Sequence, residues 1–146
     1  MRELGWVVLT VVAGVALGTA SWVRADGVER TRSTPGAQVY FISPHDGETV
    51  GAPVRVRFGL RGMGVAPAGV DLPGTGHHHL IIDAKLPPLD LPIPNDAQHR
   101  HFGAGQTETL LDLPAGRHTL QLLLGDARHV PHDPALASRP ISIMVR

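Results

Sequence analysis

The sequence predicts an all-β protein, an immunoglobulin-like antiparallel β-sandwich of about seven strands that follows an N-terminal signal segment. Three observations support this fold class. Short apolar runs recur after residue 37, and several alternate apolar with polar residues, as half-buried strands do. The 17 glycines and 13 prolines break the chain in the way that many short turns require. No stretch after residue 37 has the period of a helix, which supports the all-β class. Within that class, a small β-barrel is the alternative fold.

Six strands are predicted from these runs, over residues 38–43, 53–60, 77–84, 107–113, 117–124 and 140–145. The second is the clearest, because Val54, Val56 and Phe58 alternate with arginine and glycine. The strands 107–113 and 117–124 are separated by only three residues, which predicts a β-hairpin. A seventh strand is expected before Gly76. The proline-rich segment 85–106 is predicted to be an ordered loop that folds over one end of the sheet.

The N-terminal residues have a different character from the rest of the chain. An apolar run from Leu4 to Ala20 is followed by Val23-Arg24-Ala25, which offers a small-residue cleavage pattern. We therefore predict a signal peptide over residues 1–25, with an uncleaved membrane anchor as the alternative. Residues 26–37 lack an apolar period and are predicted to be a linker. The folded domain is then 38–146, in a protein that is periplasmic or secreted.

Composition excludes several function classes. The 13 cationic and 13 anionic residues balance, and no basic cluster with interleaved aromatic residues occurs, so nucleic acid is not a predicted partner. Cysteine is absent, which excludes disulfides, thiolate metal sites and cysteine nucleophiles. The chain has no Gly-x-Ser-x-Gly elbow, no His-Glu-x-x-His motif and no phosphate-binding loop. We therefore predict that the protein is not an enzyme.

Histidine is the residue type that points to chemistry. Seven of the nine histidines fall into three clusters, His77-His78-His79, His99-x-His101 and His129-x-x-His132. Side chains alternate along a strand, so His77 and His79 are expected on one face and His78 on the other, with Leu80 and Ile82. The other two clusters lie in predicted loops. Loops gather at the ends of a sandwich, so the three clusters can converge there.

Neutral imidazole is the commonest nitrogen ligand of metal ions. The sequence predicts non-catalytic binding of a divalent transition metal, Zn²⁺ or Cu²⁺, with nearby aspartates (Asp83, Asp126 and Asp133) as available carboxylates. The predicted ligands are His77, His79, His101 and His132, with His99 and His129 as further candidates. Cu⁺ fits less well, since Met63 and Met144 are the only sulfur-containing residues after the signal segment.

Other roles for the histidines remain open. The main alternative is an envelope interaction or structural module in which the imidazoles form a hydrogen-bond network that holds the proline-rich loops. Metal-assisted hydrolysis is a third hypothesis, and it needs an open coordination position. His45 is expected to be solvated in a turn, and His78 and His118 to be structural. The sequence leaves the protein partner unknown, and membrane contact is expected only through an uncleaved N-terminal segment.

Four blocks of the chain, in order, resemble the DUF4399 family. They are GTGHHHLIID at 74–83, HFGAGQTET at 101–109, PAGRHTLQL at 114–122 and HVPH at 129–132. The resemblance covers about residues 52–145 and implies an exported bacterial domain without an assigned activity. It therefore supports the domain boundary and export, and it supplies no reaction. Where it leads us to expect a histidine between Asp126 and His129, this chain has Ala127-Arg128, which weakens a ligand role for that loop.

Overall fold

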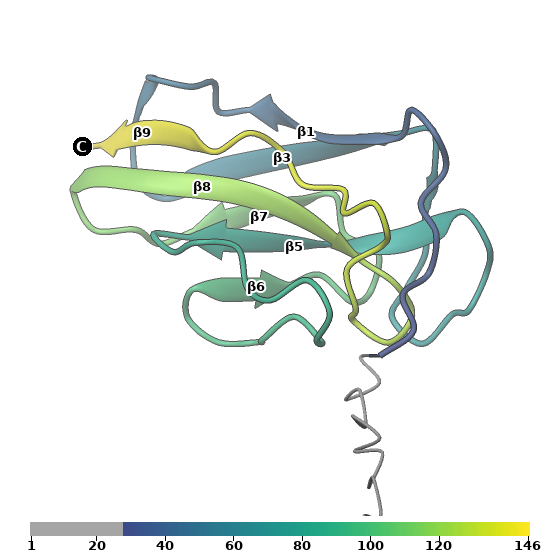
Figure 1. The fold of residues 1–146 in the computed structure, drawn as a ribbon. Helices are drawn as coiled ribbons and strands as arrows, with labels where there is room; N and C mark the ends of the chain where they lie inside the picture. Colours follow the sequence, from purple (N-terminus) through teal and green to yellow (C-terminus); the bar gives the residue numbers. More distant parts are fainter. Residues whose placement is uncertain (1–27) are drawn as a thin grey trace, which may run out of the picture.

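The computed structural model describes residues 28–146, which form two β-sheets without any helix (Figure 1). The all-β class predicted from the sequence is confirmed for this part of the chain. The predicted signal segment, residues 1–25, lies outside the described residues. Within 28–146, nothing forms a helix with the length and apolar character needed to cross a membrane.

Nine strands are present, and they include all six that the sequence predicts, with ends shifted by a few residues. The short strand expected before Gly76 is β4, whereas β2 and β6 were not predicted. The strands are β1 (Gln38–Ser43), β2 (Thr49–Val50), β3 (Val54–Arg61), β4 (Gly64–Val65), β5 (Thr75–Ile82), β6 (His99–His101), β7 (Glu108–Leu111), β8 (Gly116–Gly125) and β9 (Ile141–Val145).

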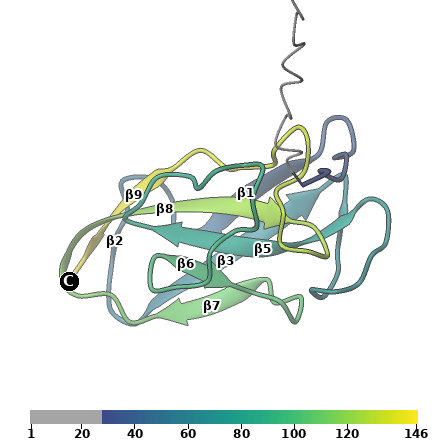
Figure 2. The ribbon, with the colours of Figure 1, turned by 60° about the horizontal axis from the view of Figure 1, so that its bottom comes forward.

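The strands divide into a sheet of three and a sheet of six. The smaller has the order β1-β3-β7, and the larger has the order β2-β9-β8-β5-β4, with β6 also paired to β5 (Figure 2). The short pairs β2–β9 and β4–β5 are parallel, so the expectation of a wholly antiparallel sandwich was wrong there. These strand orders do not establish the immunoglobulin-like topology that the sequence suggested.

The predicted hairpin between 107–113 and 117–124 is also wrong. β7 pairs with β3 in the smaller sheet, while β8 pairs with β5 and β9 in the larger one. Both edges of β8 are therefore occupied, and the short connection after β7 crosses from one sheet to the other. Short spacing predicts that two strands lie close together, but it does not predict that they pair. Here β5 and β9 occupy the two edges of β8, so β7 does not pair with β8.

The core lies between the two sheets. On β3, Val54, Val56 and Phe58 are buried while Arg55 and Arg57 are exposed, which confirms the alternation predicted for this strand. Across the interface the larger sheet contributes its own buried apolar residues, among them Leu80, Leu120, Leu122 and Ile143. Each such side chain stabilises the fold by about 1.5–3 kcal/mol through the apolar area it removes from water.

The outer face of the larger sheet is also covered. Ile81 of β5 and Leu123 of β8 point to this face and pack with Ile93, Leu86 and Leu89 of the segment that follows β5. This proline-rich segment is ordered, as predicted, but it covers the outer face of the sheet and leads into β6. Seven of the eight residues of β5 are buried as a result, and side chains on its outer face are shielded from water.

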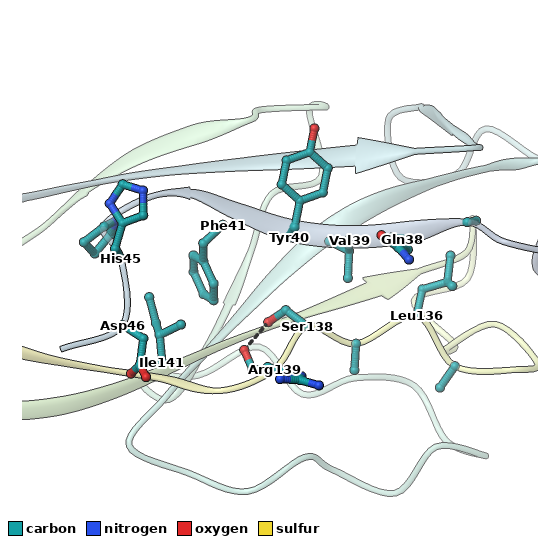
Figure 3. A pocket seen from close by; sticks show the side chains of 14 residues that line it. Gln38, Val39, Tyr40, Phe41, His45, Asp46, Leu136, Ser138, Arg139 and Ile141 are labelled. Carbon is teal, nitrogen blue, oxygen red and sulfur yellow. Dashed lines mark hydrogen bonds between the residues drawn. The ribbon is translucent and has the colours of Figure 1, made fainter. Parts of the chain in front are cut away.

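A cavity of about 540 Å³ lies elsewhere, between β1 and residues 135–141 (Figure 3). Phe41 points from β1 toward Ser138 and Ile141, whereas Tyr40 points away from them. His45 is the one histidine that lines this cavity among the described residues. The cavity is therefore separate from the three histidine clusters.

Candidate metal centre

Four histidines from three parts of the chain converge on the outer face of β5. His77 and His79 come from β5, His101 from β6 and His129 from the loop after β8. Their ring centroids lie 4.7–6.0 Å apart. We call these four residues the histidine cluster. Its formation brings together residues separated by up to 52 positions in the chain.

The ring nitrogens make the closest contacts in the cluster. The Nε2 atoms of His77 and His79 are 3.0 Å apart, and those of His101 and His129 are 3.1 Å apart. In addition, His77, His101 and His129 each offer a ring nitrogen, and these three atoms all lie within 4.8 Å of one another. His79 therefore stands beside a compact group of three potential ligands.

Strand pairing accounts for three of the four positions. His79 lies opposite His101 in the antiparallel β5–β6 pair, and His77 is two residues away on the same face. His78 points to the other face, where its ring lies 4.8 Å from that of Phe58 in the core. The predicted separation of the three consecutive histidines onto two faces is therefore confirmed.

The fourth histidine depends on a turn built around Asp126. Oδ1 of Asp126 accepts hydrogen bonds from the backbone N–H groups of Arg128 and Val130, at 2.8 and 3.0 Å. The backbone N–H of His129 donates to the carbonyl oxygen of Asp126 at 2.9 Å. His129 itself has φ of +67°, a left-handed conformation that non-glycine residues seldom adopt. The surrounding hydrogen bonds hold this conformation and aim the ring at His101.

Two glycines allow the backbone to approach the cluster closely. A Cβ atom at Gly125 would lie 2.9 Å from Nε2 of His79, and one at Gly103 would lie 2.2 Å from Cε1 of His101. Both distances are too short for a non-bonded contact. Any side chain at either position would therefore push a histidine ring away from its present place.

Burial keeps the two β5 rings of the cluster uncharged at neutral pH. His77 and His79 are fully buried, while His101 and His129 are partly exposed. Burial lowers the pKa of His77 to about 4 and that of His79 to about 2, and repulsion from neighbouring rings acts in the same direction. The pKa of His101 is lowered as well, by burial and then by His129. Neutral imidazole is the form that binds metal ions.

Several buried nitrogens in this region have no protein partner. The Nδ1 atoms of His77 and His79 make no hydrogen bond to any described residue. An unpaired buried polar atom costs about 1–3 kcal/mol, so most such atoms in folded proteins are paired with protein, water or an ion. The cluster is thus incompletely satisfied by the protein alone.

Asp126 is the only buried carboxylate among residues 28–146, with an exposed fraction of 3%. Its burial opposes ionisation, but the hydrogen bonds that it accepts from Thr31, Val130 and Arg128 outweigh this effect and lower its pKa. It is therefore ionised at neutral pH. Its negative charge acts on His77 in the direction that favours a positive charge there.

The structure brings together some of the predicted ligands and not others. His77, His79 and His101 are in the cluster, and so is His129, which the sequence placed only among the further candidates. His132 is fully buried outside it, with Nε2 3.1 Å from the carbonyl oxygen of Thr75. His99 is also outside, with Nδ1 2.9 Å from Oδ1 of Asp96.

The remaining histidines and aspartates also have distinct surroundings. His118 lies between Asp83, 2.7 Å from its Nδ1, and the carbonyl oxygen of Pro114, 2.9 Å from its Nε2. Asp133 is exposed and lies 3.5 Å from Arg30. The sequence offered no signal for Gly103, Gly125 or the turn around Asp126, because their importance depends on atoms that are distant in the chain.

Comparison with known proteins places the chain in a family. No curated protein and no solved structure gives a match. A family model described as a domain of unknown function, DUF4399, matches residues 56–146, close to the range that the resemblance suggested. This region includes the whole histidine cluster and more than half of the chain, so the protein belongs to the DUF4399 family.

Proposed function

We propose that this protein is an exported, non-catalytic domain that binds one divalent transition metal ion, Zn²⁺ or Cu²⁺, at the histidine cluster. The observation that carries the proposal is the convergence of His77, His101 and His129, whose ring nitrogens lie within 4.8 Å of one another. Three separate segments supply these rings, and the lowered pKa values of His77 and His101 favour the neutral form that binds metal ions.

The spacing of the nitrogens supports a metal of this size. Zinc binds histidine nitrogen at about 2.0–2.1 Å, so two ligands of a tetrahedral ion lie about 3.3 Å apart. The Nε2 separations of 3.0 and 3.1 Å within the two histidine pairs are slightly shorter than this. The ring nitrogens of His77, His101 and His129 lie within 4.8 Å of one another, so coordination requires the rings to move apart within each pair and the two pairs to move toward each other.

The donor set favours Zn²⁺ and Cu²⁺ over other ions. It consists of imidazole nitrogens, and borderline ions bind such ligands well, with Cu²⁺ ahead of Zn²⁺ at an equivalent site. Met63 packs against the core between the sheets, so its sulfur is not available to the cluster. Neutral histidines bring no charge of their own, and the ionised carboxylate of Asp126 offsets part of the charge of the ion.

His79 is the basis for proposing binding without catalysis. Catalytic zinc sites have three protein ligands and an open position for water or substrate. Here Nε2 of His79 lies 3.0 Å from that of His77, close enough to occupy the fourth position after a modest ring movement. The full burial of His77 and His79 also limits the access of a substrate. Export is proposed from the apolar N-terminal segment of the sequence.

A structural hydrogen-bond network is the second candidate function for the cluster. The observation that favours it is that both Nε2 pairs are at hydrogen-bond distance, which two neutral rings achieve when one donates and the other accepts. The unpaired Nδ1 atoms do not separate the two candidates, because coordination of a metal ion through Nε2 leaves them without a protein partner as well.

Titration of the purified full-length chain with Zn²⁺ and with Cu²⁺ distinguishes the metal site from the structural hydrogen-bond network. Binding of one ion per chain, with a Kd in the micromolar range or tighter, is expected to raise the melting temperature, because an ion at 100 times its Kd adds about 2.7 kcal/mol of stability. His101→Ala and His129→Ala should abolish both effects. His99→Ala is the matched control, because His99 lies in the same strand β6 but outside the cluster.

The outcome that rules out the metal proposal is a wild-type chain that binds neither ion and melts at the same temperature with and without them. If His99→Ala loses binding as completely as His101→Ala, the assignment of ligands is wrong even though a metal binds.

A further inference from the structure

The segment expected to be a linker is attached to the loop that carries His129. Arg32 and Asp133 form a parallel β-bridge, in which the N–H of Asp133 donates to the carbonyl oxygen of Thr31 at 2.9 Å and the N–H of Ser33 donates to that of Asp133 at 3.2 Å. The Arg30 guanidinium donates to the carbonyl oxygens of Pro131 and His132. We call residues 29–33 the N-terminal clasp.

Contacts run in both directions between the clasp and this loop. Arg128 donates from its guanidinium to the carbonyl oxygen of Glu29 at 2.6 Å, and Arg30 lies 3.5 Å from the carboxylate of Asp133. The clasp thus binds the loop at both of its ends, near residue 128 and near residue 133. The prediction of a linker over residues 26–37 did not include these contacts.

One contact of the clasp reaches the turn that positions His129. The hydroxyl of Thr31 donates to Oδ2 of Asp126 at 2.7 Å. The other oxygen of the same carboxylate accepts from the backbone of Arg128 and Val130, on either side of His129. Asp126 is buried, so loss of one hydrogen bond to its charge is not readily replaced by water.

We infer that Thr31 is a positioning residue of the metal centre: it fixes the Asp126 carboxylate, which holds the turn that presents His129, so that metal affinity and attachment of the clasp depend on each other. This inference rests on the proposed function. The physical reason is that His129 occupies a left-handed conformation, which persists only while its surroundings maintain it. Loosening the carboxylate allows that residue to relax away from the ligand position.

The dependence must be reciprocal. If attachment of the clasp favours the turn that binds metal, binding of metal favours attachment of the clasp by the same factor. Metal occupancy at the cluster therefore changes the freedom of a segment that leads directly toward the N-terminal end of the chain.

The test uses Thr31→Val in the full-length chain, because valine removes the hydroxyl and keeps the branched shape. The Kd for Zn²⁺ is expected to rise about tenfold, at the lower end of the range for groups that hold a ligand in place. Thr31→Ser should restore nearly wild-type affinity. Thr34→Val is the matched control, since the Thr34 hydroxyl is exposed and makes no hydrogen bond within residues 28–146.

A second measurement follows the clasp directly. Hydrogen exchange at the backbone N–H groups of Ser33 and Asp133, which pair the clasp with the loop, should become several-fold slower when Zn²⁺ is added to the wild type. It should not change in His129→Ala. General stabilisation by the ion would slow exchange throughout the domain, so the slowing at Ser33 and Asp133 should exceed that at a backbone N–H outside the clasp and its loop, such as that of Met144.

The possible results are distinct. A wild type that binds no metal overturns both this inference and the proposed function. A wild type that binds metal, with an unchanged Kd in Thr31→Val or with no change of exchange at Ser33 and Asp133, overturns the inference alone. If Thr31→Val is too unstable to titrate, the exchange measurement in the wild type decides.

Discussion

The substitution Gly125→Ala tests whether the cluster has the close packing described above. The added methyl group would lie 2.9 Å from Nε2 of His79, and also 3.3 Å from Cδ1 of Ile93. Ordinary contact begins near 3.4 Å, so the imidazole must retreat by about 0.5 Å. Gly125 does not have a positive φ, so the methyl group and not backbone strain is responsible for the effect.

Two consequences are expected from this displacement. Overpacking of a close-packed interior costs about 1–3 kcal/mol, which lowers the melting temperature by about 4 °C or more for each kcal/mol in a domain of this size. Coordination tolerates deviations of about 0.2 Å in ligand distances, so a shift of about 0.5 Å in His79 should also weaken metal binding. The increase in melting temperature on adding Zn²⁺ should therefore be smaller than in the wild type.

The assay is thermal unfolding of the variant and the wild type, each with and without Zn²⁺. Gly51→Ala is the control, because a methyl group there would meet no atom within 4 Å, and its φ is not positive. It should leave the stability unchanged or raise it by up to about 1 kcal/mol. If Gly125→Ala melts with the wild type and keeps the full response to Zn²⁺, the ring of His79 is not held where we describe it.

Two further predictions concern histidines outside the cluster. Asp83 raises the pKa of His118 above its ordinary 6.5, while hydrogen bonds, overcoming the effect of burial, lower the pKa of Asp83 below its ordinary 3.8. The pair therefore stabilises the fold fully between about pH 3.8 and 6.5, and this contribution is lost as the pH rises through the raised pKa of His118 or falls through the lowered pKa of Asp83. Asp83→Asn tests this pair, because asparagine tolerates the φ of +53° at this position. The variant should melt well below the wild type near pH 5 and closer to it near pH 9. An equal difference at both pH values would contradict the assignment of an ion pair between Asp83 and His118. His78→Leu should leave the free energy of unfolding in chemical denaturation unchanged or raise it by about 1–3 kcal/mol, because neither ring nitrogen of His78 makes a hydrogen bond of normal geometry, although the Gly59 backbone acts to raise the pKa of this ring. Metal binding should be retained, and a clear loss of stability would show that the ring is paired, with the backbone of Gly59 as its partner.

The fold was predictable where the pattern of one strand is sufficient. The alternation of Val54, Val56 and Phe58 with exposed arginines identifies a half-buried strand without reference to its neighbours. The pairing of strands was less predictable, as the region around Pro114 shows. A short connection such as residues 112–115 can join two strands within one sheet or carry the chain across to the other sheet, and the difference depends on which partners occupy the edges of β8.

The histidine cluster also has features that the pattern of one strand predicts and others that depend on distant contacts. The faces of His77, His78 and His79 could be predicted because a strand has a fixed period. His101 could be predicted as a partner from the His99-x-His101 spacing, although its pairing with His79 could not. The choice between His129 and His132 was beyond sequence reasoning, because it depends on a left-handed residue and a buried carboxylate that together reverse the chain.

The sequence by itself determined that residues 38–146 form strands rather than helices, and that two of three consecutive imidazoles share a face. These properties are local, since they follow from the spacing of side chains along one extended segment. The tertiary structure decided which rings meet, and it decided that Thr31 reaches the Asp126 carboxylate of the turn that carries His129 from 95 positions away. Such contacts arise only when packing brings distant segments together, so the local periodicity of the sequence does not predict them.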